Sequence, residues 1–524
     1  MTLDAIVVGS GFGGVMAAWP LVQAGQRVLM LERGGWVERG PENWTERGAG
    51  LITPYYTKES PYAVTAGSRR YEAGAWNCVG GQSVFYGGAS YRFRESDFVP
   101  NAGIVGESAA DWPFRYDDIE PFYSQAERLL GVAGEVANGE PRRSAPYPQP
   151  APPLSGSSRM IAEAARRAGM SPSRIPLAIS FDGNGLARPC IRCGTCDGYA
   201  CAAEAKNDLA TGIIPRLISQ GMTLRPNTVC VRLLRTGSRI TAVEYVDRVS
   251  GERGTLEAKR VLLAAGTLAT PHLLLASNLA RVNPAGEFLG RYLIRHRNAV
   301  VLGVFVRQPN PERVFDKQIA ILDLYEGAGS IQQLTPPLGL VKAYLPRGLR
   351  SAGARLVAHS SGLIVIAEDQ PRYENGVAVD WSKTDKFGLP RLNVRHSYSA
   401  RDDRAAATLI RAAKAVLRAA GTRLTWIHQI ESFSHALGTV RMGPEASTSP
   451  LDADGRYRGL DNLFIVDGSA FPRSAGLNPS LTIAANALRI GAGIARTTPA
   501  IRGRVLRTLA PDSTLPSVSL PWSS

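Results

Sequence analysis

The sequence is short of the residues that bind metals, form disulfides or cross membranes. Its 524 residues include six cysteines and six histidines, and aromatic residues make up only 7%. No uninterrupted apolar run reaches the roughly 18 residues that a membrane-spanning helix needs, so we expect no membrane span. The chain enters an apolar run within MTLDAIVV, which leaves no room for a secretory signal. We therefore expect a cytoplasmic protein.

Acidic residues are fewer than basic ones, 45 against 60, which gives a formal net charge of +15. Such a balance can favour an anionic substrate, an anionic surface or nucleic acid. The arginines are scattered, however, and no basic block alternates with aromatic residues as in a groove that binds nucleic acid. We therefore expect no nucleic-acid partner. The length exceeds what one hydrophobic core usually serves, so two or more connected domains are expected.

A strand, a glycine-rich turn and a helix follow one another at the start of the chain. Residues 5–8 are apolar, 9–14 read GSGFGG, 15–24 have helical character, and RVLMLE at 27–32 forms a second strand pattern. This order predicts a βαβ unit of a Rossmann-like α/β fold.

The turn GSGFGG matches the GxGxxG fingerprint of dinucleotide sites with Gly9, Gly11 and Gly14. These glycines serve a tight turn, a close backbone approach to pyrophosphate, and packing of the helix on the strand. Glu32 follows Gly14 by eighteen residues, where its carboxylate can accept hydrogen bonds from a ribose. NAD and FAD share the same ADP half, so the fingerprint leaves both open.

Four of the six cysteines lie in CIRCGTCDGYAC, as Cys190, Cys193, Cys196 and Cys201. The two-residue spacings can hold an iron–sulfur cluster, but the run does not end in the CxxxCP pattern of bacterial ferredoxins. Four sulfurs also suit zinc, although structural zinc sites usually keep their ligand pairs further apart. Disulfides are disfavoured in a reducing compartment. We favour thiols that only shape the loop, with no metal, and keep the iron–sulfur cluster as the second interpretation.

Five separated stretches, in order, resemble the glucose-methanol-choline (GMC) oxidoreductases, which are FAD-dependent. They are WNCVGGQSVFYGGASYRFRESDF (76–98), DWPFRYDDIEPFY (111–123), GTLATPHLLLASN (266–278), SHALGTVRMG (434–443) and VDGSAFPRSAGLNPSLTIAANALRIG (466–491). The third stretch departs from the family pattern at Asn278, where the family usually has glycine.

The resemblance implies an α/β fold with a discontinuous FAD-binding domain and a second, sheet-containing domain of GMC type. We expect the FAD-binding domain to comprise residues 1–140, 200–296 and 435–510. The substrate-binding domain is expected at 297–434, where strand-like segments such as AVVLGVFVRQ and LIVIAED alternate with loops. The Pro-rich stretch from 141 begins a connector that carries the cysteine loop and runs to 199, and residues 511–524 form a tail.

The fingerprint and the resemblance together imply a set of residues that bind FAD. They are Gly9, Gly11, Phe12, Gly13, Gly14, Glu32, Arg33, Gly80, Gly81, Ser83, Gly87, Gly88, Val229, Cys230, Gly266, Asp467, Gly468, Asn478, Pro479 and Thr482. Some relatives link FAD covalently to a histidine in the segment that here reads VGGQSVFYGG, and this chain has Phe85 at the nearest position. We therefore expect non-covalent FAD.

Oxidation of an alcohol requires a base within reach of the hydroxyl proton, and histidine suits neutral pH. Among the six histidines, His435 lies in the stretch that resembles the family's active-site segment, so the resemblance makes it the catalytic base. The family's second catalytic position, a histidine or asparagine, falls on Asn478, whose amide could stabilise the alkoxide. His428, seven residues before His435, is a candidate neighbour.

The expected reaction is therefore FAD-dependent oxidation of an alcohol group, preferably on a sugar, amino sugar or other polyol. The electrons would pass to oxygen or another acceptor. The alternatives are a flavin-dependent lyase or isomerase on the same scaffold, and an electron-transfer subunit with an iron–sulfur cluster. The sequence does not choose between oxidase and dehydrogenase, and it leaves the substrate's identity and the oligomeric state open.

Overall fold

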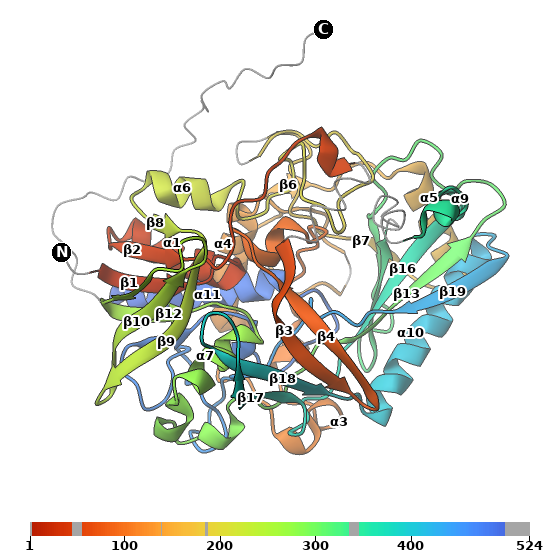
Figure 1. The fold of residues 1–524 in the computed structure, drawn as a ribbon. Coiled ribbons are helices and arrows are strands. Elements are labelled where there is room, and N and C mark those ends of the chain that lie inside the picture. Colours follow the sequence, from red (N-terminus) through yellow and green to blue (C-terminus); the bar gives the residue numbers. More distant parts are fainter. Residues whose placement is uncertain (1–2, 45–54, 138, 184–186, 335–344, 498–524) are drawn as a thin grey trace, which may run out of the picture.

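The computed structural model describes residues 3–44, 55–137, 139–183, 187–334 and 345–497. The tail expected at 511–524 lies outside these residues. Several sheets and helices combine into a mixed α/β architecture, as expected from the sequence (Figure 1). Among the described residues, none of the helices combines the length and apolar character needed to span a bilayer.

A parallel five-stranded sheet forms one side of the molecule (Figure 1). Its strand order is β20 (Leu463–Ile465), β12 (Ala258–Leu263), β1 (Leu3–Val8), β2 (Val28–Leu31) and β8 (Thr223–Arg225). The central strand β1 is buried almost throughout, as is usual for a parallel sheet that is covered on both faces. Because these strands come from three distant parts of the sequence, the sheet brings the beginning, the middle and the end of the chain together.

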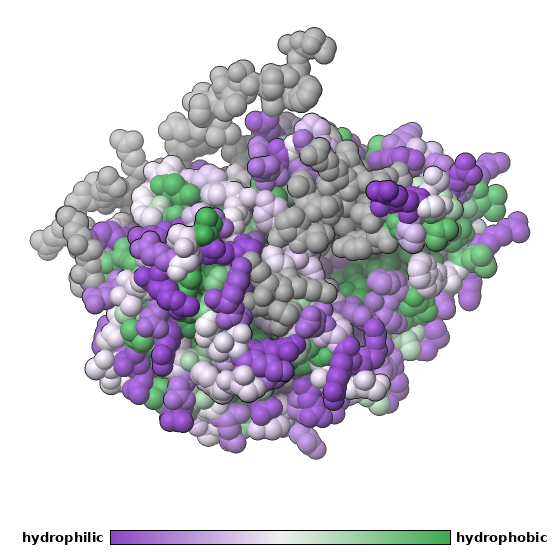
Figure 2. All heavy atoms as spheres, in the orientation of Figure 1, coloured by the Kyte–Doolittle hydropathy of each residue, from purple (hydrophilic) through white to green (hydrophobic). Residues whose placement is uncertain are grey.

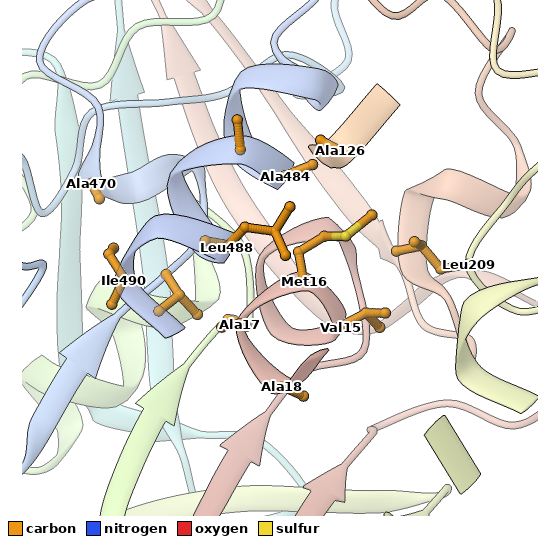
Figure 3. Close-up of a cluster of buried hydrophobic side chains, with 14 of the residues drawn as sticks. Val15, Met16, Ala17, Ala18, Ala126, Leu209, Ala470, Ala484, Leu488 and Ile490 are labelled. Carbon is orange, nitrogen blue, oxygen red and sulfur yellow. The ribbon is translucent and has the colours of Figure 1, made fainter. Parts of the chain in front are cut away.

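Helices pack on this sheet around one large apolar core. They are α1 (Phe12–Gln23), α4 (Tyr116–Leu129), α6 (Ile213–Ser219), α7 (Ala269–Ala276) and α11 (Ser480–Arg496). Figure 3 shows α1 and α11 side by side, with Met16 and Leu488 pointing toward each other. Both side chains are fully buried, and burial of a side chain of this size stabilises the fold by about 1.5–3 kcal/mol.

A three-stranded antiparallel sheet lies beside the parallel one (Figure 1). It consists of β9 (Thr228–Thr236), β10 (Arg239–Asp247) and β11 (Arg253–Leu256). Strand β9 follows β8 after two residues, so its first residues lie next to the carboxyl end of the parallel sheet. This position matters for the site, because parallel sheets present ligand-binding groups at their carboxyl ends.

A six-stranded antiparallel sheet dominates the other side of the molecule (Figure 1). Its order is β19 (Leu424–Gln429), β13 (Arg297–Val304), β16 (Ser360–Ala367), β15 (Gly329–Leu334), β14 (Ile319–Ile321) and β7 (Pro172–Arg174). Helices α10 (Ala400–Ala419) and α5 (Gly156–Arg167) share a second apolar core with this sheet, and α9 (Arg350–Ala358) lies nearby. Ser399 caps α10 by accepting a hydrogen bond from the Asp402 N–H.

The stretch expected to be a connector does more than link two domains. It supplies α5 and the edge strand β7, and its short strand β6 (Gln149–Pro150) pairs with β5 (Ala133–Gly134). The stretch expected to form the substrate domain is also shared between two sheets. Its strands β17 (Gly376–Thr384) and β18 (Pro390–His396) join β3 (Tyr56–Ala66) and β4 (Arg69–Trp76) in a four-stranded sheet.

Hydrophilic residues cover most of the described surface on the face shown in Figure 2, and hydrophobic residues appear there in small groups. The large apolar side chains are instead collected in the cores described above. Scattered exposed apolar residues are normal for a globular protein. The interior also contains a cavity, next to the carboxyl end of the parallel sheet.

Candidate active site

A cavity of about 270 Å³ lies at the carboxyl end of the parallel sheet. The ends of β1 and β2, the start of α1 and the start of β9 contribute to its wall. Most of the residues predicted to bind FAD line it, namely Gly9, Gly11, Phe12, Gly13, Glu32, Arg33, Gly81, Ser83, Val229, Cys230, Gly266, Asp467, Gly468 and Pro479. Their individual roles in binding stay predictions.

The glycine turn brings the start of α1 directly to this cavity. Gly9 has a φ of +106°, and a Cβ there would lie 2.2 Å from the carbonyl oxygen of Ala264, so the turn requires glycine. Gly11 caps α1, and a Cβ on Gly11 would meet nothing within 4 Å, because this position faces open space. The free N–H groups of a helix start attract anions, so a pyrophosphate suits this end of the cavity.

Glu32 ends β2 as a buried carboxylate beside the glycine turn. It accepts hydrogen bonds from Ser10 N at 3.0 Å, Ser10 Oγ at 2.6 Å and Gly34 N at 2.9 Å. Burial raises the pKa of Glu32, and these hydrogen bonds act in the opposite direction. The carboxylate also lines the cavity, where a ribose hydroxyl could donate a further hydrogen bond.

Asp467 follows β20 and lies against Gly13 of the glycine turn. One carboxylate oxygen accepts from Gly266 N at 2.9 Å and Thr270 Oγ1 at 2.6 Å, and the other accepts from the N–H and hydroxyl of Ser469. Burial raises the pKa of Asp467 against these bonds. The residue therefore ties α7 to the C-terminal segment while it lines the cavity.

Aromatic residues flank the cavity near Gly81. Phe85 stacks on Trp76 with ring centroids 4.5 Å apart and an interplanar angle of 26°. Trp76 and Tyr56 line the cavity, whereas Phe85 is buried and does not form part of its wall. Trp76, Asn77 and Gln82 also form part of the cavity wall. The sequence predicted no role for these three residues, although they lie within the first GMC-like stretch.

The remaining predicted FAD residues lie close to the cavity without forming its wall. The Gly80 N–H donates to Ser10 Oγ at 3.0 Å, and Gly14 packs against Gly9. Gly88 packs against Ile179, and Gly87 lies against the ion pair of Lys317 and Asp197. Thr482 is buried in α11, where its hydroxyl lies 2.7 Å from Tyr123 Oη.

His435 is half-buried on the loop that follows β19, and the residues on either side of it, Ser434 and Ala436, line the cavity. Its Nδ1 atom lies 3.1 Å from Nδ1 of His296, and the two rings are nearly perpendicular. Burial is the main cause that lowers the pKa of His435 to about 3, and positive charge on His296, when it is protonated, and on Lys317 acts in the same direction. The ring is therefore neutral at physiological pH and able to accept a proton.

Asn478 lies next to the cavity-lining Pro479, three residues after Ala475. Its Oδ1 atom accepts a hydrogen bond of 2.8 Å from Gln332 Nε2, which extends from β15 of the six-stranded sheet. The amide oxygen of Asn478 is thus engaged by the protein, and its Nδ2 group keeps two hydrogens for another acceptor. The sequence contained no local signal for Gln332.

The other histidines occupy different environments. His428 is exposed on β19, the edge strand of the six-stranded sheet, and the structure shows no contact between it and His435. It is therefore not the neighbour of the base that the sequence suggested. His296 takes that place, although the sequence pattern did not distinguish it. His272 lines the cavity and hydrogen-bonds through Nε2 to the Pro390 carbonyl at 2.6 Å.

The four clustered cysteines line a second, much smaller pocket together with Lys206. All six cysteines of the chain are free thiols, and burial raises the pKa of Cys190 to about 11. The buried Lys206 ammonium donates to the carbonyl oxygens of Tyr86, Tyr199 and Cys196. In the part of the chain that the structure describes, no three His, Cys, Asp or Glu side chains are arranged to hold a metal ion.

Comparisons with known proteins agree with this architecture. Residues 4–298 and 374–487 match the two sequence models described as GMC oxidoreductase. The chain is 30% identical to 6'''-hydroxyparomomycin C oxidase of Streptomyces lividus over 512 residues, which cover 94% of this chain and 91% of that protein. It is also 30% identical to paromamine 6'-oxidase of Streptomyces fradiae over 514 residues, with the same coverage.

The fold is similar to that of a solved enzyme as well. Pyridoxine 4-oxidase from Mesorbium loti superposes with a TM-score of 0.67 at 19% identity, covering 95% of this chain and 100% of that chain. The prediction of the family from five separated stretches is confirmed by these matches. The chain belongs to the GMC oxidoreductases and is an FAD-dependent enzyme that oxidises alcohol groups.

Proposed function

We propose that this protein oxidises a hydroxyl group of an amino sugar or related sugar, with His435 as the base and Asn478 as the group that holds the reacting oxygen. The observation that carries the proposal is the position of the two residues beside one cavity. Each is the direct neighbour in sequence of residues that line the cavity, Ser434 and Ala436 in one case and Pro479 in the other. The glycine turn and the start of α1 line the same cavity.

His435 takes the proton of the substrate hydroxyl. Its lowered pKa keeps the ring neutral, so an unshared electron pair is available on the imidazole. When bound, FAD supplies the hydride acceptor for the carbon that carries this hydroxyl. The low pKa also means that the imidazolium is disfavoured in the free enzyme, so the protonated ring must be stabilised by groups around the developing charge.

Asn478 holds the substrate oxygen while the proton leaves. Gln332 donates a hydrogen bond to the amide oxygen of Asn478. The amide nitrogen of Asn478 is therefore the group that can donate to the alkoxide. A donor that is already oriented costs no reorganisation at the moment of reaction, and loss of one such donor typically costs a factor of about 100–1,000 in rate.

FAD is held without a covalent bond. The supporting observation is Phe85, which occupies the position nearest to the linking histidine of some relatives and has no nucleophilic atom. Its ring stacks on Trp76. Denaturation of the purified protein should therefore release all of the yellow cofactor into the supernatant, and flavin that stays with the precipitated chain would contradict this part of the proposal.

A polyhydroxylated substrate is supported by two observations. The relatives with 30% identity are named for oxidation of paromamine and of a hydroxyparomomycin. The buried Oε1 atom of Gln332, on the side chain that contacts Asn478, has no hydrogen-bond partner among the described residues. A sugar hydroxyl could donate to it, which would satisfy a polar atom that is otherwise costly to bury.

Oxygen is the final electron acceptor, in keeping with the names of these relatives. The thiols of the cysteine loop then serve the local architecture, where their pocket contains the buried ammonium of Lys206. Analysis of iron and acid-labile sulfide in the purified holoenzyme tests this assignment. Stoichiometric iron and sulfide would show that the loop binds an iron–sulfur cluster. The final electron acceptor would then be an electron carrier rather than oxygen.

The substrate class is tested with the FAD-loaded enzyme under anaerobic conditions. Paromamine should bleach the flavin absorbance, whereas an analogue that lacks the 6'-hydroxyl should not. Under air the same reaction should consume oxygen and release peroxide in equal amounts. If simple alcohols bleach the flavin and no sugar or amino sugar does, the proposed substrate class is wrong.

A further inference from the structure

We propose that His296 is a positioning residue that fixes the tautomer of His435, so that the Nε2 atom of His435 is the one that takes the substrate proton. This inference rests on the function proposed above and adds a residue that acts through the base. The geometry that carries it is a chain of contacts, in which His435 contacts His296 and His296 contacts two backbone carbonyls.

The first contact, between His296 and the two carbonyls, determines which ring nitrogen of His296 carries the hydrogen. Its Nε2 atom lies 3.0 Å from the carbonyl oxygen of Ser474 and 2.9 Å from that of Ala475. Carbonyl oxygens only accept hydrogen bonds, so Nε2 must carry the hydrogen. In a neutral imidazole the other nitrogen is then an acceptor, and for His296 this is Nδ1.

The second contact, between the two rings, determines the tautomer of His435. Nδ1 of His296 faces Nδ1 of His435 at 3.1 Å. With both rings neutral, one of these atoms must donate, and His296 has already used its hydrogen on the carbonyls. The Nδ1 atom of His435 therefore carries the hydrogen, and its Nε2 atom is bare. With the opposite tautomer of His435, two electron pairs would face each other across the same distance.

The backbone around His296 is held in an uncommon conformation. His296 has a φ of +60° and Ala475 has a φ of +55°, in the left-handed region that non-glycine residues rarely adopt. Such conformations persist where the surroundings enforce them, and they concentrate at functional sites. Here the two left-handed residues are the ones joined by the hydrogen bond between the His296 ring and the Ala475 carbonyl.

A buried carboxylate enforces this arrangement. Asp369 accepts hydrogen bonds from the backbone N–H groups of His296 at 3.0 Å and Arg295 at 2.8 Å. The same carboxylate accepts from the hydroxyl of Ser474 at 2.9 Å, so it ties both segments to one point. His296 itself is only 1% exposed, and the ring has little room to turn away from His435.

The hydrogen bond between the two rings gains strength as the reaction proceeds. When Nε2 of His435 receives the hydroxyl proton, the ring becomes an imidazolium and its Nδ1–H becomes a charged donor. Hydrogen bonds from charged donors are roughly twice as strong as neutral ones. His296 therefore acts on the rate of the chemical step more than on substrate binding, because its contribution increases with the charge on His435.

Two substitutions separate this role from a general effect on the fold. His296→Asn places an amide oxygen near the position of the ring Nδ1, and asparagine tolerates the left-handed backbone. His296→Leu has a similar size but offers no acceptor. We expect His296→Leu to lower the limiting rate of flavin reduction roughly 100-fold with little change in substrate affinity, and His296→Asn to recover most of the loss.

FAD content and thermal midpoint of each variant show whether it is folded. Equal rates for wild type and His296→Leu, with FAD bound, would overturn the inference. Equal loss in both variants with full FAD content would also overturn it, because an acceptor at this position would then be irrelevant.

A spectroscopic measurement on the wild-type holoenzyme needs no folded variant at position 296. Nitrogen NMR on protein with labelled histidines distinguishes protonated from bare ring nitrogens. The signals that disappear in His435→Ala belong to His435. We expect Nδ1 of His435 to be protonated and Nε2 to be bare in the resting enzyme. A protonated Nε2 on His435, or a His296 ring with hydrogens on both nitrogens, would contradict the inference.

Failure of the proposed function gives a different result. If His435→Ala reduces flavin with substrate as fast as wild type, His435 is not the base and the proposed function fails. If His435→Ala is inactive but the NMR spectrum shows the other tautomer, the proposed function stands and only the role of His296 is wrong.

Discussion

Gln332 Nε2 donates a hydrogen bond of 2.8 Å to Asn478 Oδ1, and this contact fixes the orientation of the Asn478 amide. We predict that Gln332→Leu lowers the rate of flavin reduction roughly tenfold, because the amide of Asn478 loses its orientation. In an Asn478→Ala background the same substitution should have almost no further effect, since Gln332 acts through Asn478. Stopped-flow absorbance at saturating substrate measures both.

The neighbouring glutamine provides a matched control. Gln333 is equally buried, but its Oε1 atom accepts from Ser158 Oγ, on the other face of β15. Gln333→Leu should affect thermal stability and leave the rate of flavin reduction per bound FAD close to that of wild type. Additive effects of Gln332→Leu and Asn478→Ala would show that the two residues act independently.

Glu32 supplies the second prediction, on cofactor affinity. Its carboxylate lines the cavity and organises the glycine turn through Ser10. Glu32→Gln keeps the size and removes the charge, so FAD should bind roughly 10- to 100-fold more weakly to the apoprotein. Fluorescence titration of the apoprotein measures this change. Glu257→Gln, at an exposed position, should bind FAD as wild type does, and equal affinity of both variants would exclude the predicted role of Glu32.

The lowered pKa of His435 leads to a prediction on pH dependence. A base is active when it is deprotonated, so activity is lost as pH falls through its pKa. Since this pKa lies at about 3 and the ordinary value is 6.5, kcat/KM should show no acidic limb between about pH 8 and pH 5. An acidic limb centred near pH 6.5 that is absent in His435→Ala would contradict the environment described for this ring.

The same shift has a consequence for stability. Between pH 6.5 and pH 3 the unfolded chain binds a proton at His435 that the folded protein does not bind. The contribution of His435 to the free energy of unfolding therefore becomes less favourable as pH falls through this window. Urea denaturation of wild type and His435→Phe at several pH values measures this contribution, which should be smaller in the variant.

Arg92 gives a prediction on the fold. Its buried guanidinium donates to both carboxylate oxygens of Glu127, at 2.9 and 2.8 Å, and to Glu120 at 2.8 Å. Arg92→Met leaves buried carboxylates without their main partner and should lower the free energy of unfolding by about 3 kcal/mol.

The control is Arg69→Met, which breaks an exposed ion pair with Glu431 and should change the same quantity by less than about 1 kcal/mol. Urea denaturation of the two holoenzyme variants measures both values. A similar loss in both would show that burial does not determine the value of these ion pairs.

The sequence predicted the parts of the site that depend on local backbone geometry. Gly9 and Glu32 have a fixed spacing because the turn, the helix and the second strand follow one another directly, and both residues line the cavity. The helix Ala400–Ala419 also begins at a local signal, because Ser399 and Asp402 have the spacing of a capping box.

Contacts between distant segments could not be predicted in this way. His296 meets His435 across 139 residues, and Gln332 meets Asn478 across 146 residues. The single sequence contained no pattern that pairs these positions, because each depends on the docking of the six-stranded sheet on the C-terminal segment. The edge strand Pro172–Arg174 was missed for a similar reason, since three residues carry no periodicity and pair with Ile319–Ile321 only in the fold.

The most direct test of the central claim is the anaerobic rate of flavin reduction by paromamine, the proposed substrate, in wild type and in His435→Ala, with equal FAD content. We predict that His435→Ala lowers the limiting rate by a factor of roughly 100 to 10,000, because the hydroxyl proton has no acceptor. A variant that reduces flavin as fast as wild type would show that His435 is not the base of this enzyme.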